Sequence, residues 1–170
     1  MEEIINKVAQ SGIVTINLEE FYDETPRVLF DIKPLLFQEL ILKEKDFRAY
    51  IKTHDWSIYK NKYVALTCSV DAIVPTWAYM LLTISLQPFA KKVVFGNLET
   101  LETILFHEKI NTLDTTPYKD ARIVIKGCGN KPVPIAAYVA LTEKIKPVAK
   151  SIMYGEPCST VPLYKQPAQH

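Results

Sequence analysis

The chain has 170 residues, of which 48% are hydrophobic and 23% are charged, the balance of an ordinary soluble globular protein. Twenty Lys and Arg residues against 19 Asp and Glu residues give a net charge of +1, and only three of the basic residues are arginine. A charge so close to zero provides no broad field for nucleic acid or for an anionic membrane, so we expect neither partner.

The amino terminus and the cysteine count indicate a cytoplasmic protein. Residues 1–12 contain early acidic residues and no long apolar core, unlike a secretory signal. The longest apolar stretch is interrupted by polar residues and by Pro88, which makes it too short to span a bilayer. Three widely spaced cysteines do not form a disulfide framework.

The first sixty residues predict short strands and helices that join the same domain. In order, the pattern predicts a helical turn at 2–10, a strand at 13–18, an acidic loop at 19–24, a strand at 28–32, an ambiguous apolar segment at 35–42, a helix at 45–54 and a polar turn at 55–61.

Two later stretches, 62–96 and 122–155, repeat one another at an offset of 59 residues. The matched residues include two prolines, an Ala-Lys pair and a glycine: Pro75/Pro134, Ala78/Ala137, Tyr79/Tyr138, Leu82/Leu141, Thr83/Thr142, Pro88/Pro147, Ala90/Ala149, Lys91/Lys150 and Gly96/Gly155. With one residue more in the first loop, Cys68 also pairs with Cys128. We interpret the two stretches as duplicated strand–helix–strand units.

Each repeat predicts a strand, a loop, a helix and a second strand. In the first repeat these are strand 63–67, helix 77–86 and strand 92–95, and in the second they are strand 121–126, helix 134–146 and strand 151–154. Pro75 suits the first helical position because its missing N–H would have no partner there. A helix at 97–110 follows the first repeat, whereas prolines exclude a helix after the second.

Strands that alternate with helices predict parallel pairing through right-handed crossovers. We therefore expect an α/β fold with a three-layer, mostly parallel sheet built on the two repeats. Residues 1–170 are expected to form a single domain, with a frayed tail at 165–170.

The candidate site lies at the carboxyl ends of the parallel strands, where ligands collect in such sheets. The candidate ligand-binding residues follow the predicted strands and are Ser69, Asp71, Gly127, Gly129, Glu156, Ser159 and Thr160. Cys68, Cys128 and Cys158 also follow strands, so they could bind zinc or another thiolate-bound metal, and Cys128 and Cys158 are candidate catalytic residues. The competing interpretation is that these cysteines are small packing residues.

The loop at 127–132 only half resembles a dinucleotide-binding loop, because Pro132 stands where the third glycine is needed. The other repeat has no glycine in its loop. A nucleotide cofactor is therefore disfavoured.

Several segments resemble a family of small uncharacterised proteins of Bacteroidetes-type bacteria, a domain of unknown function. They are LILKEKDFR (residues 40–48), His54-Asp55-Trp56, Pro75-Thr76-Trp77-Ala78, SLQPFAKKVVFGNLETLE (85–102) and SIMYGEPCSTVPLYK (151–165). The resemblance covers nearly the whole chain and implies a soluble bacterial protein. It implies no catalytic residue, but it suggests that GEPCSTVP (155–162) is a family signature.

Two functional hypotheses stay open. The first is a ligand- or partner-binding protein with its site at the strand ends, for which a homodimer is one candidate assembly and the small molecule is unknown. The second is a metal- or thiol-dependent enzyme that uses Cys68, Cys128 and Cys158.

Overall fold

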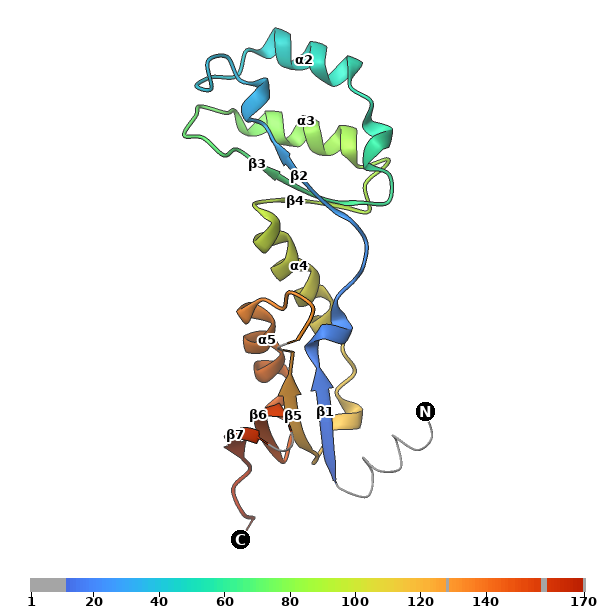
Figure 1. Cartoon of the computed structure of the whole chain (residues 1–170), viewed down its shortest axis with the longest axis vertical. Helices are drawn as coiled ribbons and strands as arrows, with labels where there is room; N and C mark the ends of the chain where they lie inside the picture. Colours follow the sequence, from blue (N-terminus) through green and yellow to red (C-terminus); the bar gives the residue numbers. More distant parts are fainter. Residues whose placement is uncertain (1–11, 128, 157–158, 170) are drawn as a thin grey trace. The chain divides into compact units, whose positions relative to one another are not determined.

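The computed structural model describes residues 12–127, 129–156 and 159–169 (Figure 1). The predicted helical turn at 2–10 and two of the three cysteines, Cys128 and Cys158, lie outside the described residues. The described chain forms two compact units, with the division inside helix α4 (Leu98–Asn111). Unit 1 is drawn from residues 1–23 and 103–170, and unit 2 comprises Glu24–Glu102.

Unit 2 contains a sheet of three parallel strands in the order β2-β3-β4. The strands are β2 (Arg27–Asp31), β3 (Tyr63–Thr67) and β4 (Lys92–Phe95), and the helices are α2 (Glu44–Thr53) and α3 (Thr76–Leu86), with 3-10 turns at Lys33–Leu35 and Trp56–Tyr59. The central strand β3 is buried from Tyr63 to Leu66, and its apolar residues suit a strand that is covered on both faces. Helix α3 carries the chain from β3 to β4, as a parallel crossover requires.

The core of unit 2 forms where α2 and α3 pack on this sheet. Phe47 of α2 meets Trp77 of α3 edge to face, with ring centroids 5.9 Å apart. Phe30 of β2 stacks on Trp56 at 6.1 Å. These aromatic contacts hold α2 and the 3-10 turn at 56–59 to the body of the unit.

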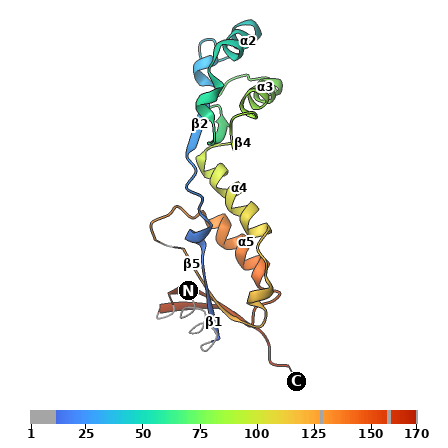
Figure 2. The ribbon, with the colours of Figure 1, turned by 90° about the vertical axis from the view of Figure 1, so that its right-hand side faces the viewer.

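Unit 1 contains a separate sheet of four strands in the order β1-β5-β6-β7. Its strands are β1 (Ile13–Asn17), β5 (Arg122–Lys126), β6 (Ser151–Glu156) and β7 (Ser159–Lys165), and its crossover helix is α5 (Ile135–Ile145), with 3-10 turns at Leu18–Phe21 and Thr116–Tyr118. The pairs β1–β5 and β5–β6 are parallel, whereas β7 pairs antiparallel with β6. Helix α5 lies along one face of this sheet, and Phe106 and Ile110 of α4 join its core (Figure 2).

The duplication predicted from the sequence is confirmed, because each repeat folds as strand, helix and strand. The offset of 59 also relates β3 to β5 without a gap, so Gly127, and not Cys128, holds the position that corresponds to Cys68. The helix residues that face the two cores are equally buried at corresponding positions: Ala78/Ala137, Leu82/Leu141 and Leu86/Ile145 are all 0% exposed.

Each repeat also takes one strand from the first part of the chain. β2 pairs with β3 and β1 pairs with β5, in the same direction and at corresponding registers. Both added strands end in a polar side chain that accepts a backbone N–H two residues further on: Asn17 from Glu19 at 3.1 Å, and Asp31 from Lys33 at 3.0 Å. The repeated module is therefore larger than the two stretches that match in sequence.

The α/β class and the mostly parallel pairing are confirmed, although the strands form two sheets. The antiparallel strand β7, which contains Pro162, is a feature that the sequence analysis did not predict. Pro75 and Pro134 directly precede their helices, which begin at Thr76 and Ile135, whereas the prediction placed the proline at the first helical position. The single domain over residues 1–170 stays a prediction. In the described part of the chain, no helix is long and apolar enough to cross a bilayer.

Candidate functional site

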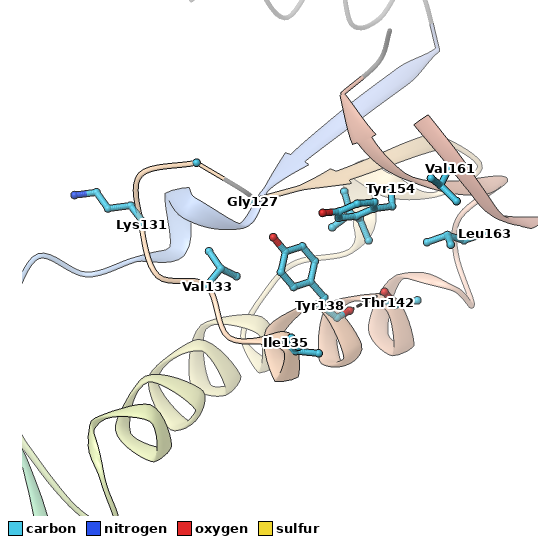
Figure 3. A pocket seen from close by; sticks show the side chains of 11 residues that line it. Gly127, Lys131, Val133, Ile135, Tyr138, Thr142, Tyr154, Val161 and Leu163 are labelled. Carbon is cyan, nitrogen blue, oxygen red and sulfur yellow. Dashed lines mark hydrogen bonds between the residues drawn. The ribbon is translucent and has the colours of Figure 1, made fainter. Parts of the chain in front are cut away.

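An apolar hollow in unit 1 lies between α5, the ends of β5 and β6, and β7 (Figure 3). Its volume is about 550 Å³, within the size range of small-molecule sites. We call it the tyrosine pocket. Its lining is mostly apolar and consists of Ile125, Gly127, Gly129, Lys131, Val133, Ile135, Tyr138, Thr142, Tyr154, Val161 and Leu163.

Two tyrosine rings form the centre of this pocket. Tyr138 of α5 and Tyr154 of β6 meet edge to face, with ring centroids 6.0 Å apart. Figure 3 shows both rings between the helix and the strands, with Val161 and Leu163 of β7 on one side. The Thr142 hydroxyl donates to the Tyr138 backbone carbonyl at 2.7 Å. Helix α5 thus supplies the Tyr138 ring, β6 supplies the Tyr154 ring, and β7 forms one wall of the pocket.

Gly127 at the end of β5 makes room for the Tyr138 side chain. A Cβ atom at position 127 would lie 2.7 Å from the Tyr138 hydroxyl oxygen and 3.1 Å from Cβ of Leu18. Any side chain there would push the ring away. The glycine therefore allows the phenol to lie against the backbone at the carboxyl end of the sheet.

A small polar cleft of about 60 Å³ adjoins the tyrosine pocket at the carboxyl ends of β1, β5 and β6. Its lining contains Asn17, Glu19, Lys126, Gly127, Gly129 and Glu156. Lys126 Nζ lies 3.4 Å from Glu156 Oε2, and Glu19 Oε1 accepts the backbone N–H of Lys131 at 2.9 Å. Gly127 and Gly129 line both hollows, so an apolar region and a polar region meet at this loop.

Unit 2 has a smaller hollow at the corresponding place, between α3 and β4. Its volume is about 390 Å³ and its lining is Leu66, Thr76, Tyr79, Met80, Thr83, Val93, Val94 and Phe95. Tyr79 and Phe95 meet edge to face at 5.1 Å, as Tyr138 and Tyr154 do in unit 1. We call this hollow the β4 groove.

Cys68 lies beside the β4 groove and packs near Tyr79. Burial raises the pKa of Tyr79, and the neighbouring Cys68 thiol and Asp31 carboxyl raise it further. The Cys68 thiol donates to the Val70 carbonyl at 3.2 Å. The Cys68 side chain packs against the core of unit 2, as a small packing residue does.

The structure brings some of the predicted site residues together and separates others. Gly127, Gly129 and Glu156 share the polar cleft. Ser159 and Thr160 lie on β7 opposite Glu156 and Gly155. Ser69 and Asp71 belong to unit 2, where the Ser69 hydroxyl and N–H both donate to Asp31.

The predicted metal site is not tested, because Cys128 and Cys158 lie outside the described residues. Among residues 12–127, 129–156 and 159–169, no group of three His, Cys, Asp or Glu side chains could hold a metal ion. The metal and the thiol chemistry of Cys68, Cys128 and Cys158 stay predictions.

The sequence analysis missed the residues that give unit 1 its pocket. The strand prediction stopped before Val161 and Leu163, because the proline between them argues against a strand. Tyr138 was named only as the residue that matches Tyr79 in the other repeat. Its match to Tyr79, together with the aromatic match of Tyr154 to Phe95 at the same offset, could have indicated a repeated aromatic pair.

Comparison with known proteins gives a family for the chain. No curated protein and no solved structure matches the sequence. A family model described as "Protein of unknown function (DUF2480)" matches residues 2–166, nearly the whole chain. The chain belongs to this family of proteins of unknown function.

Proposed function

We propose that this protein is a cytoplasmic binding protein and that its ligand occupies the tyrosine pocket of unit 1. The observation that carries the proposal is the pocket itself, with about 550 Å³ of space and a mostly apolar lining around two aromatic rings. Sites for small molecules are typically apolar hollows with a few polar groups. The location at the carboxyl ends of β5 and β6 agrees with the usual place of ligands in parallel sheets.

The chemistry of the lining favours a ligand with an apolar ring and one polar end. Tyr138 and Tyr154 present ring edges and faces for aromatic contact, and Val161 and Leu163 add aliphatic surface. The adjoining polar cleft begins at Gly127 and Gly129, so a hydroxyl or amide on the ligand would lie at that loop. The cleft also contains Glu156, which the sequence analysis proposed as a ligand-binding residue.

A titration with 2-naphthol, a neutral ring with one hydroxyl, tests this proposal. We expect the backbone amide signals of the Gly127–Val133 loop, Tyr138 and Tyr154 to shift in ¹⁵N-correlated NMR spectra. Naphthalene should bind at least about threefold more weakly, because it lacks the hydroxyl that would reach the polar cleft.

Two matched variants of α5 distinguish this pocket from general apolar contact. Ile135 is 81% exposed and lines the pocket, whereas Val139, one turn further on, is 62% exposed and does not line it. Ile135→Lys should weaken 2-naphthol binding about fivefold or more, and Val139→Lys should leave it unchanged. Equal losses in the two variants, or shifts scattered over unit 2, would contradict the proposal.

The alternative of a metal- or thiol-dependent enzyme stays a prediction, as does a homodimer. Metal analysis of the purified protein, before and after Cys158→Ser, addresses the enzyme hypothesis directly. A stoichiometric metal that is lost in this variant would favour it over the binding protein.

A further inference from the structure

The two repeats differ in what lies beside their last parallel strand. In unit 1, β7 pairs along the outer edge of β6 and supplies Val161 and Leu163 to the tyrosine pocket. In unit 2, β4 is an edge strand of the sheet formed by the described residues. The β4 groove has a corresponding aromatic pair, Tyr79 and Phe95, but no strand among the described residues supplies the wall that β7 provides in unit 1.

Exposure at corresponding positions shows the effect of this difference. Phe95 on β4 is 67% exposed, whereas its counterpart Tyr154 on β6 is 38% exposed. Ile152 of β6 is fully buried, but its counterpart Val93 is only partly buried and lines the β4 groove. An apolar surface and a sheet edge therefore coincide at β4.

We propose that β4 binds an extended segment of a partner protein, which adds to the sheet as an antiparallel strand and fills the β4 groove. The antiparallel pairing of β7 with β6, at the corresponding place in unit 1, is the template for this interaction. Addition of a strand to a sheet edge, with alternate side chains in pockets, is a common mode of peptide recognition. This partner site is separate from the small-molecule site proposed in unit 1.

The template also defines which side chains the partner segment needs. In unit 1, Val161 lies opposite Tyr154, Leu163 follows two residues later, and Lys165 lies opposite Ser151. Transferred to unit 2, this register requires an apolar residue opposite Phe95, a second apolar residue two positions on, and a residue opposite Lys92, the counterpart of Ser151.

Charge indicates which type of residue should lie opposite Lys92. It also argues against a second copy of this chain as the partner that binds β4. The β7 strand of another copy would bring Lys165 opposite Lys92, with Lys91 beside it. Like charges directly opposite one another destabilise a strand pair, whereas opposite charges stabilise it. The partner segment is therefore expected to carry an acidic residue four positions after its first apolar anchor.

A synthetic peptide with the β7 sequence Ser159–Lys165, carrying Lys165→Glu, tests the proposal on the full chain. We expect NMR signals of Val93, Phe95, Gly96 and Tyr79 to shift on titration. The unaltered peptide should bind about threefold more weakly, the ratio that one cross-strand charge pair supplies.

The backbone pairing between the peptide and β4 can be tested separately from the side-chain contacts. Two versions of the peptide, one N-methylated at Thr160 and the other at Val161, should behave differently, because these neighbours lie on the same side of the register shift in the β6–β7 pair and only one of their N–H groups faces β4 in an antiparallel pair. One version should lose binding and the other should keep it. Equal binding by both versions would overturn the proposal.

Two exposed residues give a matched pair of protein variants. Phe95 is 67% exposed and lines the groove, and Ile84 of α3 is 68% exposed and does not line it. Phe95→Asp should reduce peptide binding at least tenfold, and Ile84→Asp should leave it within twofold. Peptide-induced shifts confined to unit 1, the absence of shifts, or a concentration-dependent dimer that already buries β4 without peptide would each overturn the proposal.

Discussion

The two repeats have the same scaffold but differ at its edges. Both have a crossover helix with the same fully buried positions, the same edge-to-face aromatic pair and a first strand taken from the beginning of the chain. They differ at the residue after the central strand, which is Cys68 in unit 2 and Gly127 in unit 1. In the part of the chain that the structure describes, they also differ in the strand β7, which pairs with β6 in unit 1 and has no counterpart beside β4. The shared residues therefore support the fold, and the differing residues shape the two hollows.

Two structural differences between the repeats explain why the tyrosine pocket and the β4 groove differ. Gly127 lets the Tyr138 hydroxyl approach the backbone, whereas the Cys68 side chain occupies the corresponding place near Tyr79. β7 then adds two apolar side chains to the wall in unit 1. Unit 1 thus has a pocket suited to a small molecule, and unit 2 has a groove beside a strand edge.

The largest effect is expected from truncation of the shared core. Leu82→Ala and Leu141→Ala each remove a side chain that is 0% exposed, at corresponding places in the two helices. Each should lower the free energy of unfolding by about 2–5 kcal/mol, measured by urea denaturation with far-UV circular dichroism. The exposed counterparts Met80→Ala and Val139→Ala should change it by about 0.5 kcal/mol or less. A loss below about 1 kcal/mol in either leucine variant would show that the two helices are not equivalent in the core.

A smaller effect is expected at the paired glycines that follow β4 and lie in β6. Gly96 and Gly155 have φ angles of +138° and +109°, which side-chain-bearing residues rarely adopt. Alanine at either position should cost about 1–3 kcal/mol in the same urea experiment.

The two glycines should respond differently to a second substitution. A Cβ at Gly96 would lie 2.7 Å from the Thr100 side chain, but at Gly155 it would lie 2.7 Å from the backbone oxygen of Ser159 in β7. Thr100→Ala should therefore recover part of the stability that Gly96→Ala loses, since two of the close atoms disappear. In unit 1 the obstacle is backbone, and Gly155→Ala should also loosen β7. No recovery with Thr100→Ala would mean that the φ angle alone sets the cost.

Much of the fold could be predicted because it follows local patterns. The run of apolar residues in β3, the proline before each crossover helix and the offset of 59 identified both repeats within a residue or two. β7 was missed because Pro162 argues against a strand. Proline is tolerated at a sheet edge, however, and β7 is the edge strand of the unit 1 sheet.

The site was less predictable because it depends on contacts between distant parts of the chain. The positions after the strands named Gly127, Gly129 and Glu156, and these three residues line the polar cleft. Asn17 and Glu19 reach the same cleft only because β1 pairs with β5, more than a hundred residues away in sequence. Strand order, which the sequence does not specify, decides which side chains meet.

The smallest predicted effect concerns the polar ends of the two added strands, Asp31 on β2 and Asn17 on β1, which hold corresponding registers. Burial raises the pKa of Asp31, but the hydrogen bonds from Ser69 and from the backbone N–H groups of Lys33 and Ser69 outweigh it and hold the pKa below its usual value of 3.8. Asp31→Asn introduces in unit 2 the residue type that unit 1 has at the corresponding position, Asn17. It should cost about 0.5–1 kcal/mol at pH 7, since Asp31 is only partly buried and solvent screens its charge.

The pH dependence of the free energy of unfolding separates the effect of the Asp31 charge from the effect of a changed hydrogen-bond geometry. Because the folded-state pKa is lowered, the stabilisation by the Asp31 carboxylate is complete above about pH 5 and is lost as the pH falls below 3.8 toward the folded-state pKa. Trp56 and Trp77, the two tryptophans of the chain, both lie in unit 2 and report its unfolding in urea by fluorescence. The difference between the Asp31→Asn variant and the unmodified protein should therefore shrink from pH 7 to pH 3, while Asp71→Asn, an exposed change in the loop after β3, should show little difference at either pH. An equal loss at both pH values would mean that Asp31 acts through the shape of its hydrogen bonds and not through its charge.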